Sequence, residues 1–114
     1  MKIKRVYENP DKKDGLRILV DRLWPRGLTK EKASISLWLK DIAPSTELRK
    51  WFGHDPARWQ GFRKRYFEEL AEKREQIDQL LAQAKRRGLT LVYSAKDTEH
   101  NQAVALKEFM ELPA

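Results

Sequence analysis

The sequence of 114 residues contains no cysteine and only two histidines. The absence of cysteine excludes disulfide bonds, thiolate nucleophiles, iron–sulfur clusters and cysteine-ligated zinc. His54 and His100 lack the His-x-x-x-His spacing of a helical metal pair, so we predict no metal site. The sequence also lacks a Walker loop and the Gly-x-Gly-x-x-Gly of dinucleotide-binding folds, and it therefore indicates no particular cofactor.

Long apolar runs are missing as well. Residues 1–7 carry three basic side chains and no apolar stretch of a signal peptide, and no run reaches the length of a transmembrane helix. We therefore expect a cytoplasmic protein with no membrane partner. A chain of this length can bury a core without crosslinks, so residues 1–114 are expected to form one domain.

Basic residues outnumber acidic ones by 24 to 17, which gives a formal net charge of +7. Such an excess favours encounters with phosphate-bearing or other anionic partners. The excess is spread over both halves of the chain and forms no basic tail. Alternating charges over much of residues 56–87 are typical of a solvent-exposed helix face.

Two short apolar runs, residues 17–20 and 89–93, dominate the hydrophobic pattern. Runs of this kind are typical of strands buried on both faces, as in a parallel sheet covered by helices. The pattern predicts strands at residues 3–7, 16–21 and 89–93, and residues 36–40 fit either a third strand or a helix. The turn-rich connection between the first two strands is short, which leaves a hairpin open.

Capping and helix-breaking residues mark the helical segments. A gap in the apolar periodicity at residues 72–76 indicates either an exposed middle or a bend in the longest helix. The start and stop signals are Thr29 before residues 30–33, Ser45 and Gly53 around residues 46–52, Asp55–Pro56 and Gly88 around the longest helix, and Thr98 near the start of the last one. The predicted fold class is α/β, a single compact layered domain with a small, mostly parallel sheet flanked by helices.

Both buried strands lead into polar segments, residues 21–27 and 94–101. Ligands bind at the carboxyl ends of parallel strands, so these segments form the predicted site. Arginine forks and the start of a final helix beside a lysine favour an anion. The predicted ligand-binding residues are Arg22, Arg26, Lys96 and Asn101.

Three further side chains are candidates for catalysis, and whether the protein is an enzyme is left open. His100 near a helix start suits a general base, and Asp21 lies at the end of its strand. Ser94 could be a nucleophile, although no Gly-x-Ser-x-Gly elbow surrounds it. A structural alternative remains for Asp21 and Arg22, which could pair with each other or with Lys96 and Asp97 in a network at the sheet edge.

The leading functional hypothesis is that the protein binds a small, phosphate-bearing anion at the strand ends, with catalysis unassigned. A nucleic-acid-binding module is the first alternative, because of the net charge and because Trp24 and Trp59 lie among arginines. Trp24 is also interpreted as a lid on the core. A small protein-interaction domain that docks through its long helix is the second alternative. The sequence fixes neither the oligomeric state nor a cofactor.

Four motifs in the order found here resemble the YeaO-like branch of the domain of unknown function 488 family. They are RILVDRLWPRGL at residues 17–28, WLKDIAPS at 38–45, LRKWFGHDP at 48–56 and YSAKDTEHN at 93–101. The resemblance implies a compact cytoplasmic bacterial α/β domain and supplies no reaction. Some relatives outside this branch carry cysteine and histidine near the start of the last helix. Asn101 and Gln102 stand there in this chain, so no thiol chemistry is carried over.

Overall fold

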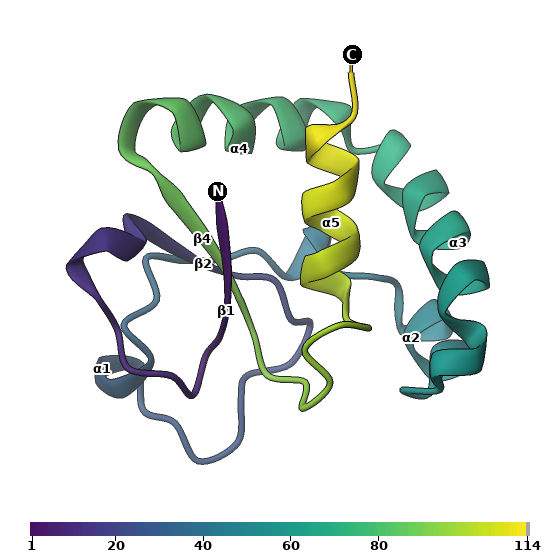
Figure 1. The fold of residues 1–114 in the computed structure, drawn as a ribbon, viewed down its shortest axis with the longest axis horizontal. Coiled ribbons are helices and arrows are strands. Elements are labelled where there is room, and N and C mark those ends of the chain that lie inside the picture. Colours follow the sequence, from purple (N-terminus) through teal and green to yellow (C-terminus); the bar gives the residue numbers. More distant parts are fainter. Residues whose placement is uncertain (114) are drawn as a thin grey trace.

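The computed structural model describes residues 1–113, which form a small sheet with helices packed around it (Figure 1). The strands are β1 (Lys2–Arg5), β2 (Leu16–Leu19), β3 (Leu37–Trp38) and β4 (Leu89–Tyr93). The helices are α1 (Lys30–Ala33), α2 (Thr46–Phe52), α3 (Trp59–Ala71), α4 (Arg74–Arg87) and α5 (Gln102–Glu111), with 3₁₀ turns η1 (Lys12–Asp14), η2 (Lys40–Ile42) and η3 (Pro56–Arg58). Within residues 1–113, no helix combines the length and apolarity that crossing a bilayer requires.

The strands are all parallel and lie in the order β1-β4-β2-β3. β4 occupies the centre of the sheet, where Leu91 pairs with Ile3 on one side and Ile18 on the other. The predicted α/β class with a parallel sheet is therefore confirmed. The hairpin alternative for β1 and β2 is wrong, because β4 lies between them and pairs with both.

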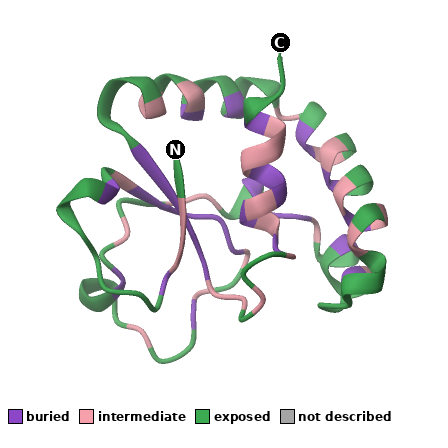
Figure 2. Ribbon diagram, viewed as in Figure 1, coloured by how far each residue is buried: buried purple, intermediate pink, exposed green. Residues whose placement is uncertain are grey.

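The central strand is buried along its whole length, as its uninterrupted apolar run predicts (Figure 2). Leu91 belongs to the cluster formed with α2, α3, α4 and α5, whereas Val92 points to the opposite face. There it packs beneath α1 and the loops that hold Trp24 and Trp38. The sheet is thus covered by four helices on one face and mainly by loops on the other, and its strand ends remain available for a site.

One polar residue in the second strand is buried rather than exposed. Arg17 is only 4% exposed, and its guanidinium forms an ion pair with Asp14 at 2.7 Å. It also donates to the backbone oxygens of Ala33 and Ser34. Lys4 contacts the same Asp14 carboxylate at 3.3 Å. This buried pair ties the beginning of β2 to β1 and to the end of α1.

Most helix ends lie at the residues whose chemistry predicts them. The Ser45 hydroxyl accepts from the N–H of Leu48, and Gly53 ends α2 in the left-handed conformation. Gly88 ends α4 with a positive φ of 75° but an extended ψ of 152°. The apolar gap at residues 72–76 marks a break between α3 and α4, because no apolar side chain holds the exposed linking residues against the core.

Several element boundaries differ from the predictions. The last helix begins at Gln102 rather than near Thr98, because Asn101 supplies the cap by accepting from the N–H of Val104. β3 covers only two residues of the predicted 36–40. β1 and β2 each end two residues before the predicted position, although Val6 and Val20 still donate to β4.

Candidate functional site

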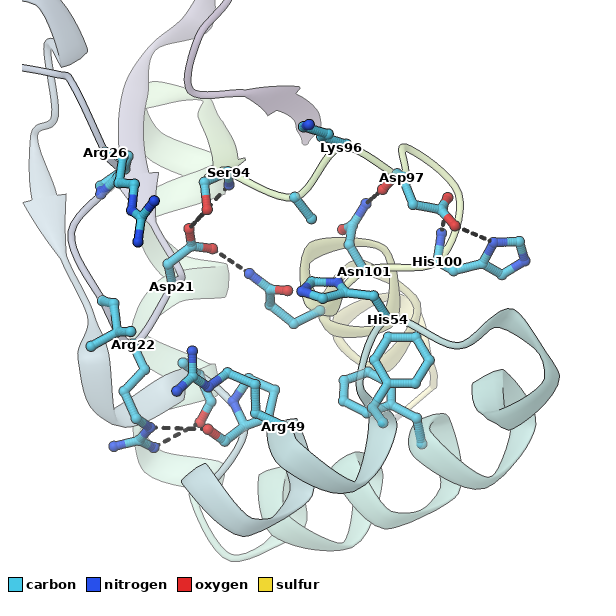
Figure 3. Close-up of a pocket in the computed structure, with 18 of the residues that line it drawn as sticks. Asp21, Arg22, Arg26, Arg49, His54, Ser94, Lys96, Asp97, His100 and Asn101 are labelled. Atoms are coloured by element: carbon cyan, nitrogen blue, oxygen red, sulfur yellow. Dashed lines mark hydrogen bonds and ion pairs between the residues drawn. The ribbon is translucent and has the colours of Figure 1, made fainter.

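The carboxyl ends of β2 and β4 meet at a cavity of about 620 Å³ (Figure 3). The parallel pairing of these strands brings residues 21–26 and 94–102 together. The remaining wall comes from the loop before α2, from α2 and the turn that follows it, and from α3. All seven site residues predicted from the sequence line this cavity: Asp21, Arg22, Arg26, Ser94, Lys96, His100 and Asn101. The volume lies in the range of small-molecule sites in proteins.

Asp21 is the most buried charged group of the cavity, with 7% of its surface exposed. Its Oδ2 accepts from the backbone N–H of Ser94 at 3.0 Å and from the Ser94 hydroxyl, and its Oδ1 accepts from the Gln102 amide. Burial raises the pKa of Asp21, and the hydrogen bonds from Ser94 and Gln102 together with the nearby Arg49 offset this only in part. Through these hydrogen bonds, the Asp21 carboxylate holds Ser94 and Gln102 in place.

The basic side chains of the wall are not neutralised by carboxylates. Arg22, Arg26, Arg49 and Lys96 form no ion pair with any acidic group in residues 1–113. Arg26, Arg49 and Lys96 are exposed. The Arg22 guanidinium donates to the backbone oxygens of Pro44 at 3.0 Å and Ala43 at 3.1 Å. Arg22 therefore also holds the loop before α2, and the structural pairing of Arg22 with Asp21 is not formed.

The turn before α5 is closed by its own side chains. Asp97 Oδ1 accepts from the N–H groups of Glu99 and His100, and Oδ2 contacts His100 Nδ1 at 2.9 Å. The hydrogen bond from Glu99 and the His100 side chain hold the pKa of Asp97 below its ordinary value. Asn101 is 2% exposed, and its amide both caps α5 and donates to the oxygen of Asp97. The Asn101 side chain is thus fully engaged in the turn.

The catalytic candidates do not form a nucleophile–base pair. The Ser94 hydroxyl donates to Asp21, and neither histidine hydrogen-bonds Ser94 within residues 1–113. Activation of a serine by histidine requires that contact. His100 instead packs its ring edge-on against Trp59, with the centroids 5.3 Å apart. Trp24 donates to the oxygen of Leu28, which fits its interpretation as a lid more closely than a free stacking surface.

The cavity also has lining residues that are not among the seven predicted, and Arg49, His54 and Gln102 are polar examples. Arg49 lies within the helix predicted at residues 46–52, and His54 follows the glycine that ends it. His54 occupies the turn after α2, at a φ of 57°, and it also lines the cavity. Gln102 is the first residue of α5. It directly follows the predicted polar segment 94–101, and this position is a signal that could have identified it.

Comparison with known proteins is informative at this point. A family model described as the inactive DUF488-N3 subclade matches residues 1–113. The chain belongs to this DUF488 subclade. The uncharacterized protein YeaO of Escherichia coli K12 is 46% identical over 107 residues, which cover 94% of this chain and 93% of that protein. The uncharacterized protein Rv3073c of Mycobacterium tuberculosis H37Rv is 50% identical over 70 residues, 61% of this chain and 59% of that protein.

No solved structure is significantly similar to this DUF488 chain. The match to the family model and to YeaO confirms the resemblance carried by the four sequence motifs. Neither relative brings a named activity, so the site has to be interpreted from its own chemistry.

Proposed function

We propose that the cavity binds a small anionic ligand that carries a phosphate group. The observation that carries this proposal is the state of the charges: Arg26, Arg49 and Lys96 have no acidic partner within residues 1–113, whereas Asp21 and Asp97 are already hydrogen-bonded. A bound anion would form ion pairs with these unpaired cations, and arginine and lysine are the usual phosphate ligands. Arg22 retains N–H donors beyond those used on the backbone and belongs to the same set.

Binding without turnover is the simpler interpretation. Ser94 lacks a histidine partner, and the subclade is described as inactive. We assign Asp21 to positioning of Ser94 and Gln102 rather than to proton transfer. Asn101 is assigned to the cap of α5, and His100 to the rim of the cavity.

Pyrophosphate is a suitable probe, and isothermal titration calorimetry measures its binding directly. We expect the variant with Arg26→Ala and Lys96→Ala to bind pyrophosphate at least about tenfold more weakly than the unmodified protein, because two charge-assisted contacts are removed. Both side chains are exposed, so the fold is expected to be unaffected.

A matched variant with Arg86→Ala and Arg87→Ala removes the same charge from the end of α4, outside the cavity. It is expected to keep the affinity for pyrophosphate. An equal loss in both variants would mean that net charge, and not the cavity, governs binding, and the proposal would be wrong.

A second candidate function rests on the opposite end of the sheet. Three segments that carry exposed basic residues meet there. Lys2 Nζ donates to the backbone oxygen of Lys13, and the start of β2 lies beside Gly88 at the end of α4. None of them forms an ion pair within residues 1–113. This surface, called the basic end, consists of Lys2, Lys12, Lys13, Lys85, Arg86 and Arg87. It has the character of a contact surface for a nucleic-acid backbone.

Fluorescence anisotropy with a labelled DNA duplex tests the basic end. If it binds nucleic acid, the affinity should fall steeply between about 50 and 200 mM salt. The combined variant Lys13→Ala, Arg86→Ala and Arg87→Ala should flatten that dependence by a slope of roughly 0.9 per lost phosphate contact. The cavity variant Arg26→Ala with Lys96→Ala serves as the control. An unchanged salt slope in the combined variant would exclude the basic end as the binding surface.

A further inference from the structure

The cavity wall is rich in rings, which a bare phosphate would leave unused. Six aromatic side chains line it, namely Tyr7, Trp24, Phe52, His54, Phe62 and His100, and of these Tyr7 and His54 are exposed. Phe52 and Phe62 are buried and stack on each other with their centroids 4.4 Å apart, so the ring that this cluster offers to a ligand is the exposed one of His54, 6.4 Å from that of Phe52. Arg26 lies across the cavity from His54 (Figure 3). The charged group and the planar group of one ligand would therefore contact different side chains, Arg26 and His54.

The amide of Gln102 is held in one orientation. Its Nε2 donates to Asp21, and the carboxylate accepts on both oxygens, so the amide oxygen of Gln102 must lie on the other side. One N–H and the amide oxygen of Gln102 are left free of this contact. An oriented donor beside an acceptor is the pattern with which glutamine pairs with the edge of a nucleobase.

Asn101 does not offer the same pair, although it is adjacent in sequence. Its oxygen accepts from Val104, one of its N–H groups donates to Asp97, and the residue is only 2% exposed, so the pair is not presented to a ligand. Gln102 is therefore the side-chain amide available to a ligand in this part of the cavity.

We propose that the ligand is a mononucleotide. Its base packs against the ring-lined wall with one edge hydrogen-bonded to Gln102, and its phosphate contacts Arg26 and Lys96. This inference rests on the proposed anion binding and names the class of ligand. The volume of about 620 Å³ suits a ligand of several rings or groups and exceeds what a single phosphate needs.

Calorimetric titrations with AMP, GMP, CMP and UMP, compared with ribose 5-phosphate, test the inference. We expect at least one mononucleotide to bind about tenfold or more tightly than ribose 5-phosphate, because stacking and edge hydrogen bonds are added to the same phosphate contacts. Equal binding of ribose 5-phosphate and all four mononucleotides would overturn the mononucleotide assignment and leave anion binding intact. Absence of binding by every probe, pyrophosphate included, would refute both.

The variant Gln102→Leu tests the role of the amide, since leucine is similar in size and cannot hydrogen-bond. It should reduce the affinity for the preferred mononucleotide to near that of ribose 5-phosphate, while ribose 5-phosphate itself binds as before. Gln79→Leu, on the exposed surface of α4, makes the same substitution outside the cavity and should change neither affinity. A preferred mononucleotide whose binding is the same in Gln102→Leu would contradict recognition by this amide. If Gln102→Leu fails to fold, the comparison with ribose 5-phosphate in the unmodified protein decides the ligand class.

Discussion

Replacing Asp14 by alanine is expected to lower the free energy of unfolding by about 3–5 kcal/mol, because it leaves a buried arginine without its counter-charge. Asp14 is 2% exposed and Arg17 4% exposed. The Asp14 carboxylate also accepts from the N–H of Asp11 at 3.0 Å and contacts Lys4. Alanine removes all of these contacts at once, at the point where η1 leads into β2.

Urea denaturation followed by circular dichroism measures this loss. Asp78→Ala is the matched control, since Asp78 pairs with Arg74 at 3.0 Å on the exposed surface of α4. Exposed pairs of this kind stabilise by only about 0.3–0.5 kcal/mol. A loss in Asp14→Ala no larger than that in Asp78→Ala would mean that the buried pair does not stabilise the fold as described.

The buried pair of Asp14 and Arg17 also makes the stability of the fold depend on pH in a definite direction. Burial acts to raise the pKa of Asp14, but hydrogen bonds from Asp11, Arg17 and Lys4 outweigh it, so its pKa lies below the ordinary value. Its stabilising contribution is therefore present above the pKa of the unfolded chain, near 3.8, and is lost as the pH falls through the lower folded pKa. The stability difference between the unmodified protein and Asp14→Ala should shrink on acidification over that interval.

Replacing Gly15 by alanine is expected to cost about 3 kcal/mol or more. Gly15 has a φ of 65°, and a Cβ there would lie 2.6 Å from the backbone oxygen of Gly88. Together with a ψ of −137°, this φ lies in a region that is adopted almost only by glycine, which alone costs an alanine about 1–3 kcal/mol, and the overlap with a fixed backbone adds to it. Because Leu16 donates to Gly88, this substitution tests the parallel alignment of β2 with β4.

Gly27→Ala separates the two contributions. Gly27 has a φ of 75°, but no atom lies within 4 Å of its Cβ position. Its substitution should therefore cost only the conformational part, about 1–2 kcal/mol. Denaturation midpoints for both variants give the comparison. Equal losses at Gly15 and Gly27 would contradict the close approach of Gly15 to Gly88, and with it the described start of β2.

The features predicted correctly from the sequence are those determined by neighbouring residues. Ser45 and Gly53 bound α2 because a hydroxyl cap and a left-handed glycine act within one helical turn. The run at residues 89–93 is buried because no polar residue other than Thr90 interrupts it. The start of α5 was placed too early, since Asp97 is as good a cap as Asn101 and only the folded turn distinguishes them.

Contacts between distant segments were beyond sequence reasoning. Arg17 looks exposed by its chemistry, and its burial depends on Asp14 and on the end of α1. The location of the cavity could be predicted because parallel strands end on the same side. The complete set of residues that line the cavity could not be predicted. Arg49 reaches the cavity from α2, and the Gln102 amide is oriented by its hydrogen bond to Asp21.

The central claim is that a small anion binds where β2 and β4 end. Titration of ¹⁵N-labelled protein with pyrophosphate, followed by amide chemical shifts, tests it residue by residue. The account predicts the largest shifts in residues 21–27 and 94–102, with residues 12–16 and 85–88 little changed. Shifts confined to residues 12–16 and 85–88, at the basic end, would contradict it.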